Sequence, residues 1–380
     1  MKPVMVVLFV DALGWSLASA RADFAAPLPH RREIATLLGF SSGALPTAFT
    51  GRMPSEHGRW LMYRRAGLEP SPFAGFEKLA WLPGRLRRSW KLSQWLTRRV
   101  AKRVHGYFNL YEVPPHELAQ FDLAEKADIF APGGLPLDSL WDALQRRGVR
   151  WRGWNWRTPE AQAFAELRDA VKAGAHDFLF LYTADLDALL HREGSRGANV
   201  HERMGRYDAW TRELSASAGR PVWLYLCSDH GMVDVDAHAD VMARVNALPF
   251  ARGRDYVAFY DSTMARFWWR TPAARDAVRS ALAAEPLGRW LTDDELRAEG
   301  ALFEKREYGD DVFLLRPGAL LVPSFMGSRP VAGMHGYDAK HPDMTALLAS
   351  NRELPADVRH LADLRGFLER ELDALATEAA

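Results

Sequence analysis

Residues 222–231 read Val-Trp-Leu-Tyr-Leu-Cys-Ser-Asp-His-Gly, an apolar run that stops at a carboxylate, an imidazole and a glycine. A short run of this kind, rich in aromatic residues, is typical of a strand that is buried on both faces of a parallel sheet. Open α/β sheets place their functional groups just beyond the carboxyl ends of such strands. Asp229 and His230 stand at that position, so this stretch predicts both the fold and the place of its chemistry.

Two further apolar runs end in the same way, one at Asp11 and one just before Asp187. Strand-like runs alternate with helical patterns through residues 1–60 and 140–235, which is typical of doubly wound α/β folds. We therefore predict an α/β protein with a mostly parallel sheet and helices on both of its faces.

The whole chain, residues 1–380, is expected to form this core with two interruptions. Residues 64–135 are dense in Trp and Arg and contain several prolines, which predicts a basic insertion. Residues 250–320 contain two aromatic strand-like runs followed by a helical pattern, which predicts a small α+β cap. Leucines at helical spacing from Asp357 to Leu375 predict a final helix that packs on the sheet.

Composition limits the class of protein. The chain has a formal charge of +1, with 48% hydrophobic and 26% charged residues, so nothing in its overall charge favours a nucleic acid polymer as partner. Its single cysteine, Cys227, excludes an internal disulfide and favours a reducing, cytoplasmic compartment. No stretch reaches the roughly 20 apolar residues that span a membrane.

Metal-binding side chains follow the predicted strands. Asp187 and His191 are four residues apart, so on a helix they share one face and can bind one ion together. His335 would complete a set of three ligands that leaves a position open for substrate. A glycine follows Asp229-His230, which predicts either a sharp turn that aims both side chains at one place or a capping Asp beside a surface His. His335-Gly336 repeats the His-Gly pattern and favours the first interpretation.

A candidate nucleophile lies in the turn Gly39-Phe40-Ser41-Ser42-Gly43. Serines in such turns are often only helix caps. However, a metal-bound hydroxyl loses its proton readily, and adjacent backbone amides can bind an oxyanion or phosphate. Two divalent ions carry about +4 and three aspartates with one alkoxide carry about −4, so the assembled site would accept a phosphate without excess negative charge.

Five motifs together resemble the alkaline phosphatase superfamily, and most closely its type I phosphodiesterase/nucleotide pyrophosphatase branch. They are Val10-Asp11-Ala12, Thr-Gly-Arg-Met-Pro-Ser-Glu-His-Gly at residues 50–58, Asp187-x-x-x-His191, Ser228-Asp229-His230-Gly231-Met232 and His335-Gly336-Tyr337-Asp338. Sulfatases, alkaline phosphatases proper and the cofactor-independent phosphoglycerate mutases carry other residues around their nucleophiles and fit less well.

The resemblance implies that Ser41 is the nucleophile, because the family places it nine residues before the Thr of the second motif. It also implies two zinc ions, one held by Asp187, His191 and His335, and the other by Asp11, Asp229 and His230 with Ser41 touching it. His57 belongs to the second motif but has no ligand role there, so we interpret it as structural.

The chain departs from the family pattern at two positions. The family nucleophile is usually Thr, and an Asn that contacts the phosphate often follows three residues later, where this chain has Ala44. The absence of that Asn argues against ordinary nucleotide pyrophosphatase activity. Ser42 is a candidate to bind substrate in its place, or to be the nucleophile itself.

The predicted activity is metal-dependent hydrolysis of phosphate esters, with phosphodiester or pyrophosphate bonds preferred over monoesters. An alternative is a transferase that moves a phosphorylated head group in envelope polymer or lipid-linked metabolism. The expected substrate is therefore a phosphorylated small molecule or a lipid-linked phosphate. Two divalent ions are expected, most simply zinc, although manganese or iron suit the same carboxylate and imidazole ligands.

Residues 78–104 carry nine basic and no acidic residues. Apolar side chains recur there every four residues, at Leu92, Leu96, Val100 and Val104, which predicts an amphipathic helix. One interpretation is a peripheral contact with a membrane surface or an anionic substrate. The other is a solvated helix that packs on the core by its apolar side.

Overall fold

The computed structural model describes residues 2–87, 89–217 and 220–378. The chain divides into two compact units. The first unit contains the residues up to Met53, then Phe130–Asp234, and the residues from Val331 onward. The second unit joins Pro54–Ile129 with Val235–Pro330.

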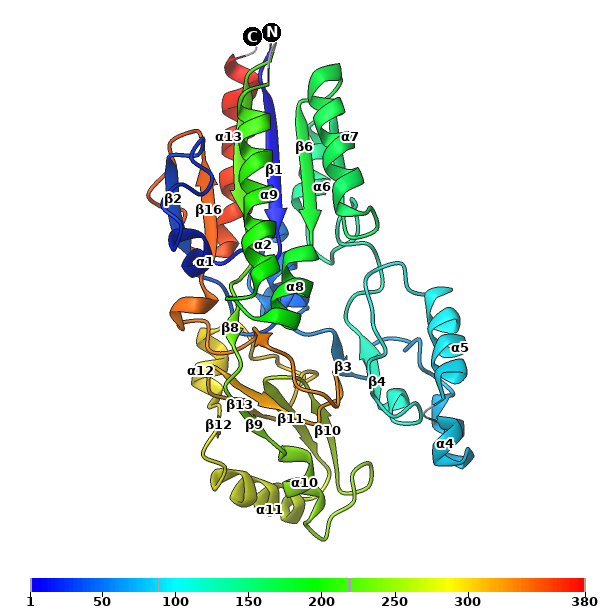
Figure 1. Cartoon of the computed structure of the whole chain (residues 1–380). Coiled ribbons are helices and arrows are strands. Elements are labelled where there is room, and N and C mark those ends of the chain that lie inside the picture. Colours follow the sequence, from blue (N-terminus) through cyan, green and yellow to red (C-terminus); the bar gives the residue numbers. More distant parts are fainter. Residues whose placement is uncertain (1, 88, 218–219, 379–380) are drawn as a thin grey trace. The chain divides into compact units, whose positions relative to one another are not determined.

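Six strands form the central sheet of the first unit (Figure 1). In spatial order they are β2 (His30–Ile34), β16 (Ala346–Ser350), β7 (Val222–Cys227), β1 (Val4–Val10), β6 (Phe178–Thr183) and β5 (Trp151–Trp154). The strands β1, β5, β6 and β7 run parallel, and β16 runs antiparallel to both of its neighbours. The prediction of a mostly parallel sheet is therefore confirmed.

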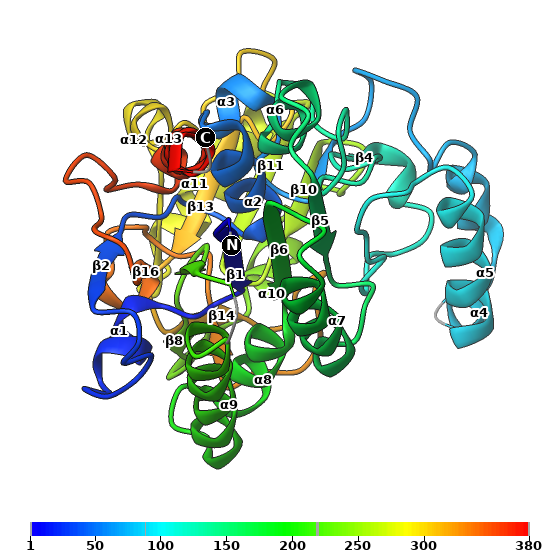
Figure 2. The same cartoon turned by 90° about the horizontal axis from the view of Figure 1, so that it is seen from above.

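Helices cover both faces of this sheet. Seen from above in Figure 2, one face carries α2 (Ser41–Thr50), α6 (Leu140–Arg146) and α13 (Leu364–Glu378). The other face carries α1 (Trp15–Ser19), α7 (Glu160–Ala173), α8 (Asp185–Glu193) and α9 (Ala198–Ser215). The doubly wound α/β architecture predicted from the alternating pattern is thus confirmed.

The final helix begins at Leu364, seven residues later than the leucine pattern from Asp357 suggests. A short 3-10 turn, η4 (Leu361–Asp363), precedes it. The His360 side chain accepts a hydrogen bond from the amide of Ala362 at 3.1 Å and so caps this turn. A side-chain cap of this kind fixes where the helical region starts, and leucine spacing alone does not reveal it.

Three central strands end at one edge of the sheet. β1 pairs in register with both of its neighbours, so that Val10 lies opposite Thr183 and Phe9 lies opposite Cys227. All seven residues of β1 are buried, which explains why its sequence is continuously apolar. The segments that follow the three strands therefore emerge at the same level, which is where Asp11 lies.

A short two-stranded pairing extends from this edge. β8 (Val233–Asp234) pairs antiparallel with β15 (Gly333–Met334), and the 3-10 turn η3 (Pro342–Met344) follows. This pairing holds the chain just before His335 beside the chain just after His230.

An antiparallel sheet forms one part of the second unit. Its strands, in spatial order, are β10 (Tyr256–Tyr260), β11 (Met264–Trp269), β13 (Asp311–Leu315) and β12 (Gly288–Trp290). The same part contains α10 (Val241–Asn246), α11 (Pro272–Ala283), α12 (Asp293–Ala298) and the paired strands β9 (Ala237–Ala239) and β14 (Ala319–Leu321). The two strands predicted over residues 256–260 and 264–269 form as β10 and β11.

Residues 54–129 supply the other part of the second unit. Its elements are α3 (Pro54–His57), β3 (Tyr63–Arg65), η1 (Phe76–Trp81), α4 (Gly84–Arg87), α5 (Trp90–Ala101), η2 (Leu118–Gln120) and β4 (Phe121–Leu123). The ring of Phe259 lies 4.8 Å from that of Tyr63 and 5.1 Å from that of Phe121, measured between centroids. Two segments that the sequence suggests as separate insertions therefore share one aromatic core. Among the described residues, no helix is both long and apolar enough to cross a membrane.

Candidate active site

The structure brings all six predicted metal ligands together at the strand-end edge of the first unit. They form two groups of three, Asp187 with His191 and His335, and Asp11 with Asp229 and His230. Within each group the candidate ligand atoms lie within 4.8 Å of one another. The expected pattern of strand-end ligands therefore converges in space.

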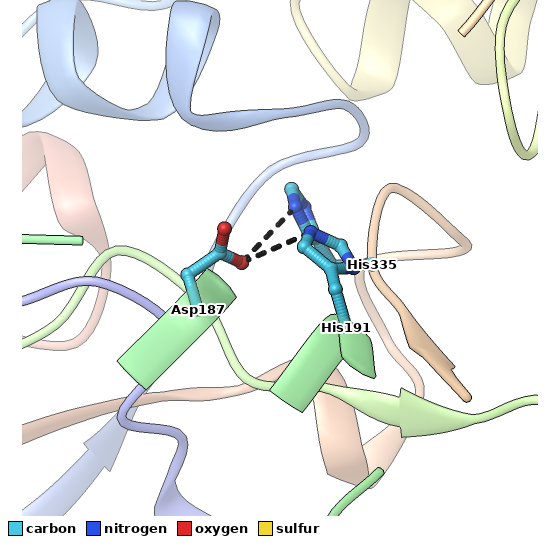
Figure 3. A group of neighbouring side chains, drawn as sticks. All are labelled: Asp187, His191 and His335. Carbon is cyan, nitrogen blue, oxygen red and sulfur yellow. Dashed lines mark ion pairs between the residues drawn. The ribbon is translucent and has the colours of Figure 1, made fainter. Parts of the chain in front are cut away.

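The first group is centred on one carboxylate oxygen (Figure 3). The Oδ1 atom of Asp187 lies 3.3 Å from Nε2 of His191 and 3.5 Å from Nε2 of His335. Asp187 and His191 both belong to α8, where a spacing of four residues places them on one face as predicted. The Nδ1 atom of His191 donates a hydrogen bond of 2.8 Å to the carbonyl oxygen of Gly333, which turns its Nε2 toward the carboxylate.

The second group is more deeply buried. The Nε2 atom of His230 lies 3.3 Å from Oδ1 of Asp11 and 3.4 Å from Oδ2 of Asp229. His230 donates from Nδ1 to the carbonyl oxygen of Gly231 at 2.9 Å, which turns its Nε2 toward the carboxylates. Asp229 is held in turn by the amide of Ala12, which donates to its Oδ1 at 3.3 Å.

The two groups adjoin each other through their imidazoles. The rings of His230 and His335 stack with centroids 3.8 Å apart and planes 14° apart. The ring of Phe40 meets His335 edge to face at 5.2 Å. This packing restrains the plane of the His335 ring.

A close backbone approach explains the glycine after His230. A Cβ atom on Gly231 would lie 2.1 Å from the carbonyl oxygen of Asp343, a distance that no side chain tolerates. The amide of Gly231 also donates to the carbonyl of Met344 at 3.0 Å. The glycine after Asp229-His230 is therefore required because the segments around Gly231 and Asp343 pass in direct backbone contact next to the site.

Three of the candidate ligands have pKa values that are shifted from their ordinary values. Burial raises the pKa of Asp11 well above its usual value, and the carboxylates of Asp229 and Asp187 raise it further. Burial also raises the pKa of Asp187, but His191 and His335 lower it more, so its net pKa lies below the ordinary value. Burial lowers the pKa of His335 well below its usual range. A bound cation would favour the ionised carboxylate and the neutral imidazole together.

The donor atoms fit divalent metal ions. Two buried carboxylate oxygens, Oδ1 of Asp187 and Oδ2 of Asp229, have no hydrogen-bond donor among the residues that the structure describes. Burial lowers the pKa of His191, but Asp187 raises it more, so its net pKa lies above the ordinary value. One carboxylate with two imidazoles, and two carboxylates with one imidazole, are ligand sets that suit zinc.

Ser41 lies directly beside the second group. Its Oγ is 3.0 Å from Nε2 of His230 and 3.4 and 3.5 Å from the two carboxylate oxygens of Asp11. It is the first residue of α2, so the amides of a helix N-terminus surround it. Ser42 follows in the same turn, and Ala44 is buried and apolar, so the position of the family Asn supplies no side-chain donor.

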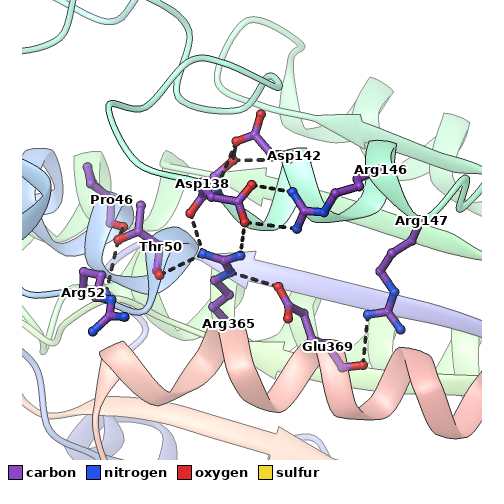
Figure 4. A network of polar contacts seen from close by, with 10 residues as sticks. Pro46, Thr50, Arg52, Asp138, Asp142, Arg146, Arg147, Arg365 and Glu369 are labelled. Atoms are coloured by element: carbon purple, nitrogen blue, oxygen red, sulfur yellow. Dashed lines mark hydrogen bonds and ion pairs between the residues drawn. The ribbon is translucent and has the colours of Figure 1, made fainter.

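The length of α2 explains the spacing between Ser41 and the next motif. The helix has ten residues, so it begins at Ser41 and ends at Thr50. Gly51 then adopts a left-handed conformation with φ of 67° and ends the helix. Arg365 of α13 donates to the carbonyl oxygen of Thr50 at 3.2 Å, and it also binds Glu369 and Asp138 (Figure 4).

Sequence reasoning missed one polar group at the site. The hydroxyl of Tyr182, in β6, donates to Oδ2 of Asp11, the carboxylate oxygen that also lies 3.4 Å from Oγ of Ser41. In the sequence, Tyr182 resembles the other aromatic residues of a buried strand. Its position next to the end of the strand is the only signal that it could reach the site. His57, interpreted as structural, is fully buried in α3 of the second unit, where burial and then Arg59 lower its pKa to about 3.

Comparison with known proteins gives a family and a fold. The family model described as type I phosphodiesterase/nucleotide pyrophosphatase matches residues 40–338. The match includes Ser41 and five of the six ligands, and Asp11 precedes it. No curated protein matches the chain.

Solved structures of the same fold come from mouse and human. Murine ectonucleotide pyrophosphatase/phosphodiesterase 5 has 15% sequence identity and a TM-score of 0.66, covering 98% of this chain and 95% of that one. The human protein has 14% identity, a TM-score of 0.65 and the same coverage. An inactive threonine-to-alanine variant of the murine protein, in complex with AMP, has 16% identity, a TM-score of 0.65 and again this coverage.

Proposed function

Because the chain belongs to the type I phosphodiesterase/nucleotide pyrophosphatase family, in the alkaline phosphatase superfamily, we propose that Ser41 attacks the phosphorus of its substrate at a two-metal centre. The chain is a metal-dependent hydrolase of this class, and hydrolysis of phosphodiester bonds is its reaction. The proposal adds the nucleophile, the number of metal ions and the residues that hold them.

The position of Ser41 carries the proposal. Its Oγ touches both His230 and Asp11, so the hydroxyl faces the same point as the second ligand group. Metal ions bound by the two groups would lower the pKa of this hydroxyl and offset negative charge on the phosphoryl oxygens. Tyr182 holds Asp11 in place, which keeps one carboxylate oxygen directed at Ser41.

The reaction divides into two displacements. The Ser41 oxygen loses its proton and forms a bond to phosphorus, while the ester or anhydride oxygen of the substrate leaves with its electron pair and takes up a proton. Water then attacks the phosphoserine, releases the phosphate product and restores the hydroxyl. The amides at the start of α2 favour an anion at this position, because the first turn of a helix has donors without partners inside the helix.

Ser42 is proposed to take part in substrate binding. It lies in the first turn of α2 next to the nucleophile, whereas the buried methyl group of Ala44 stands where the family has its Asn. A serine hydroxyl reaches less far than an asparagine amide and donates a single hydrogen bond. We therefore expect weaker contact with a non-bridging phosphate oxygen than in relatives that carry the Asn.

Two zinc ions are the proposed cofactors, one for each group of three ligands. The mixed imidazole and carboxylate donors support zinc, and manganese or iron suit the same donors. A phosphodiester or pyrophosphate is the proposed substrate bond, with a phosphorylated small molecule or a lipid-linked phosphate as the substrate class. The AMP bound to the inactive murine relative supports a nucleotide as one candidate.

The cytoplasmic location is proposed from Cys227 alone, which is a buried free thiol. Burial raises the pKa of this thiol to about 12, so it remains protonated and unreactive. A chain with one cysteine has no internal disulfide to form, which is typical of reducing compartments.

The test compares Ser41→Ala with Ser42→Ala in the metal-loaded protein. Elemental analysis should find two metal ions per chain in both variants, because all six protein ligands remain. Hydrolysis of an aryl phosphodiester should fall at least about a thousandfold in Ser41→Ala and about tenfold in Ser42→Ala.

Four outcomes would contradict parts of this proposal. Loss of metal in Ser41→Ala with restored activity at high zinc would make the serine only a ligand. Full activity of Ser41→Ala would exclude it as nucleophile. Formation of a transfer product with an added alcohol, faster than hydrolysis, would favour the transferase alternative, and a preference for an aryl monoester would favour a phosphomonoesterase.

A further inference from the structure

The most exposed apolar side chains of the described residues lie in one short segment of the second unit. Four large side chains are more than half exposed, and all lie in residues 81–95: Trp81 at 78%, Trp90 at 70%, Leu86 at 53% and Trp95 at 52%. The next most exposed is Tyr107 at 43%. Clustered exposed tryptophans are uncommon on a surface that only faces water, so they indicate an interaction site.

The inner side of α5 is already packed. Leu96 and Val100 are buried in a core that includes Phe76 of η1. The Ser89 side chain caps the helix by accepting a hydrogen bond from the amide of Leu92 at 3.3 Å. The interpretation of a helix that packs by its apolar side is thus correct for this side of α5, and it leaves the tryptophans unexplained.

The same segment presents cations without counterions. Seven basic side chains in it are exposed, and within the described residues none of them forms an ion pair: Lys78, Arg85, Lys91, Arg98, Arg99, Lys102 and Arg103. Residues 78–104 contain no acidic residue that could neutralise them. The local charge is therefore strongly positive although the whole chain carries only +1.

One stripe along α5 and its C-cap residue carries three cations and one indole. Lys91, Trp95, Arg98 and Lys102 follow at intervals of four, three and four residues, which places them on one stripe of a helix. The guanidinium of Arg99 lies 5.6 Å from the ring centroid of Trp95. The neighbouring α4 lies beside α5 in both views of the molecule (Figures 1 and 2).

We propose that the exposed side chains of residues 78–104, here called the Trp-Arg surface, dock on a membrane that contains anionic lipids. Lysine and arginine side chains attract anionic head groups, and tryptophan rings settle at the boundary between head groups and acyl chains. A nucleic acid or an acidic protein could bind to the basic side chains by charge. Neither partner explains why three tryptophans and a leucine are exposed to solvent in the same segment. The proposal concerns only the second unit and is independent of Ser41 and the metal ions.

The experiment is co-sedimentation of the full-length protein with sucrose-loaded vesicles. One set contains phosphatidylcholine alone, and the other also contains roughly 30% phosphatidylglycerol. We expect at least about tenfold stronger partitioning into the anionic vesicles at low salt, and loss of most of this difference between roughly 50 and 500 mM salt. Equal recovery with both lipids at low salt would overturn the proposal.

The tryptophan contribution is tested by Trp90→Ala combined with Trp95→Ala. We expect partitioning into anionic vesicles to fall at least about tenfold, because the rings no longer enter the interface. Trp156→Ala is the matched control, since Trp156 is 39% exposed but lies in the first unit. Equal effects of the double variant and the control would contradict a specific role for the segment.

The charge contribution is tested by Lys91→Gln combined with Arg98→Gln. We expect partitioning to fall about tenfold or more, with a weaker dependence on salt. Lys172→Gln combined with Lys305→Gln removes two other exposed cations and should leave partitioning unchanged. Hydrolysis of a soluble aryl phosphodiester should be unchanged in all these variants, which shows that they are folded.

A duplex DNA probe separates the proposal from its nearest competitor. We expect little binding to DNA, and no change in it when the two tryptophans are replaced. Binding to DNA at the same salt without binding to anionic vesicles would show that the Trp-Arg surface is a nucleic-acid site instead.

Discussion

Replacing Arg365 with Met should weaken both the fold and the reaction, because this side chain ties α13 to the end of the helix that begins at Ser41. Its Nη1 donates to the carbonyl oxygen of Thr50 at 3.2 Å, and its Nε donates to Glu369 at 2.9 Å. A further contact joins it to Asp138. Met keeps much of the aliphatic stem but removes every donor.

The expected loss of stability is about 2–3 kcal/mol. The Thr50 carbonyl is buried, and a hydrogen bond from a charged donor to such a group contributes about 1.5–3 kcal/mol. The partners Glu369 and Asp138 have side chains that are 30% and 45% exposed, so screening limits each ion pair to about 0–1 kcal/mol. We therefore take most of the loss from the Thr50 contact alone.

Urea unfolding and steady-state kinetics measure the two effects. The unfolding midpoint should fall without a change in slope, and kcat should fall about tenfold with little change in KM, because a small displacement of α2 misplaces Ser41, the proposed nucleophile. Arg370→Met is the matched control on the same helix, since Arg370 and its partner Asp357 are 52% and 67% exposed. The reasoning is refuted if both variants lose equal stability, or if Arg365→Met is destabilised while its kcat is unchanged.

Two other predictions follow from the same structure. Gly231→Ala places a methyl group 2.1 Å from the carbonyl oxygen of Asp343 and should lower the unfolding free energy by at least about 3 kcal/mol. The control is Gly205→Ala in the middle of α9, where a Cβ atom meets nothing within 4 Å, and it should be neutral or stabilising by about 0.5–1 kcal/mol. Equal unfolding midpoints of the two variants would contradict the first estimate. The pKa of buried His57 is lowered to about 3, below its unfolded value near 6.5, so the unfolded state binds the proton first and stability is lost as pH falls from about 6.5 toward about 3. At pH 5 this group should cost about 2 kcal/mol relative to pH 7, and urea unfolding of His57→Gln should show a pH dependence that is flatter by this amount. Parallel pH profiles of the two proteins would exclude the effect.

The sequence was sufficient to predict that the six candidate metal ligands come together at one edge of the sheet. Asp11 and Asp229 lie just after apolar strands, and Asp187 lies in the first turn of the helix that follows a third. Strands that are buried on both faces of a parallel sheet are typically apolar throughout, so these runs can be recognised in the sequence. The ends of such strands meet at one edge, so convergence of the side chains follows from the fold class alone. The spacing from Ser41 to Thr50 was equally informative, because it is the length of α2.

Tertiary structure decided the contacts between segments that are far apart in the chain. The strand β16 reads Ala-Leu-Leu-Ala-Ser and lacks the β-branched and aromatic residues that favour a strand, yet it lies between β7 and β2 in the sheet. The hydroxyl of Tyr182 on Asp11 and the guanidinium of Arg365 on Thr50 depend on which surfaces pack together. No local pattern encodes such a choice.

The second unit shows the same division. The sequence of residues 78–104 determined the charge, the helix and the identity of its aromatic residues, because these depend only on local composition and period. Only the folded chain decided that Leu96 is buried and that Trp90 and Trp95 are not, since Phe76 and its neighbours cover one side of α5 and leave the other open. Local apolar spacing determines that a face exists, and the packing of distant segments determines what covers it.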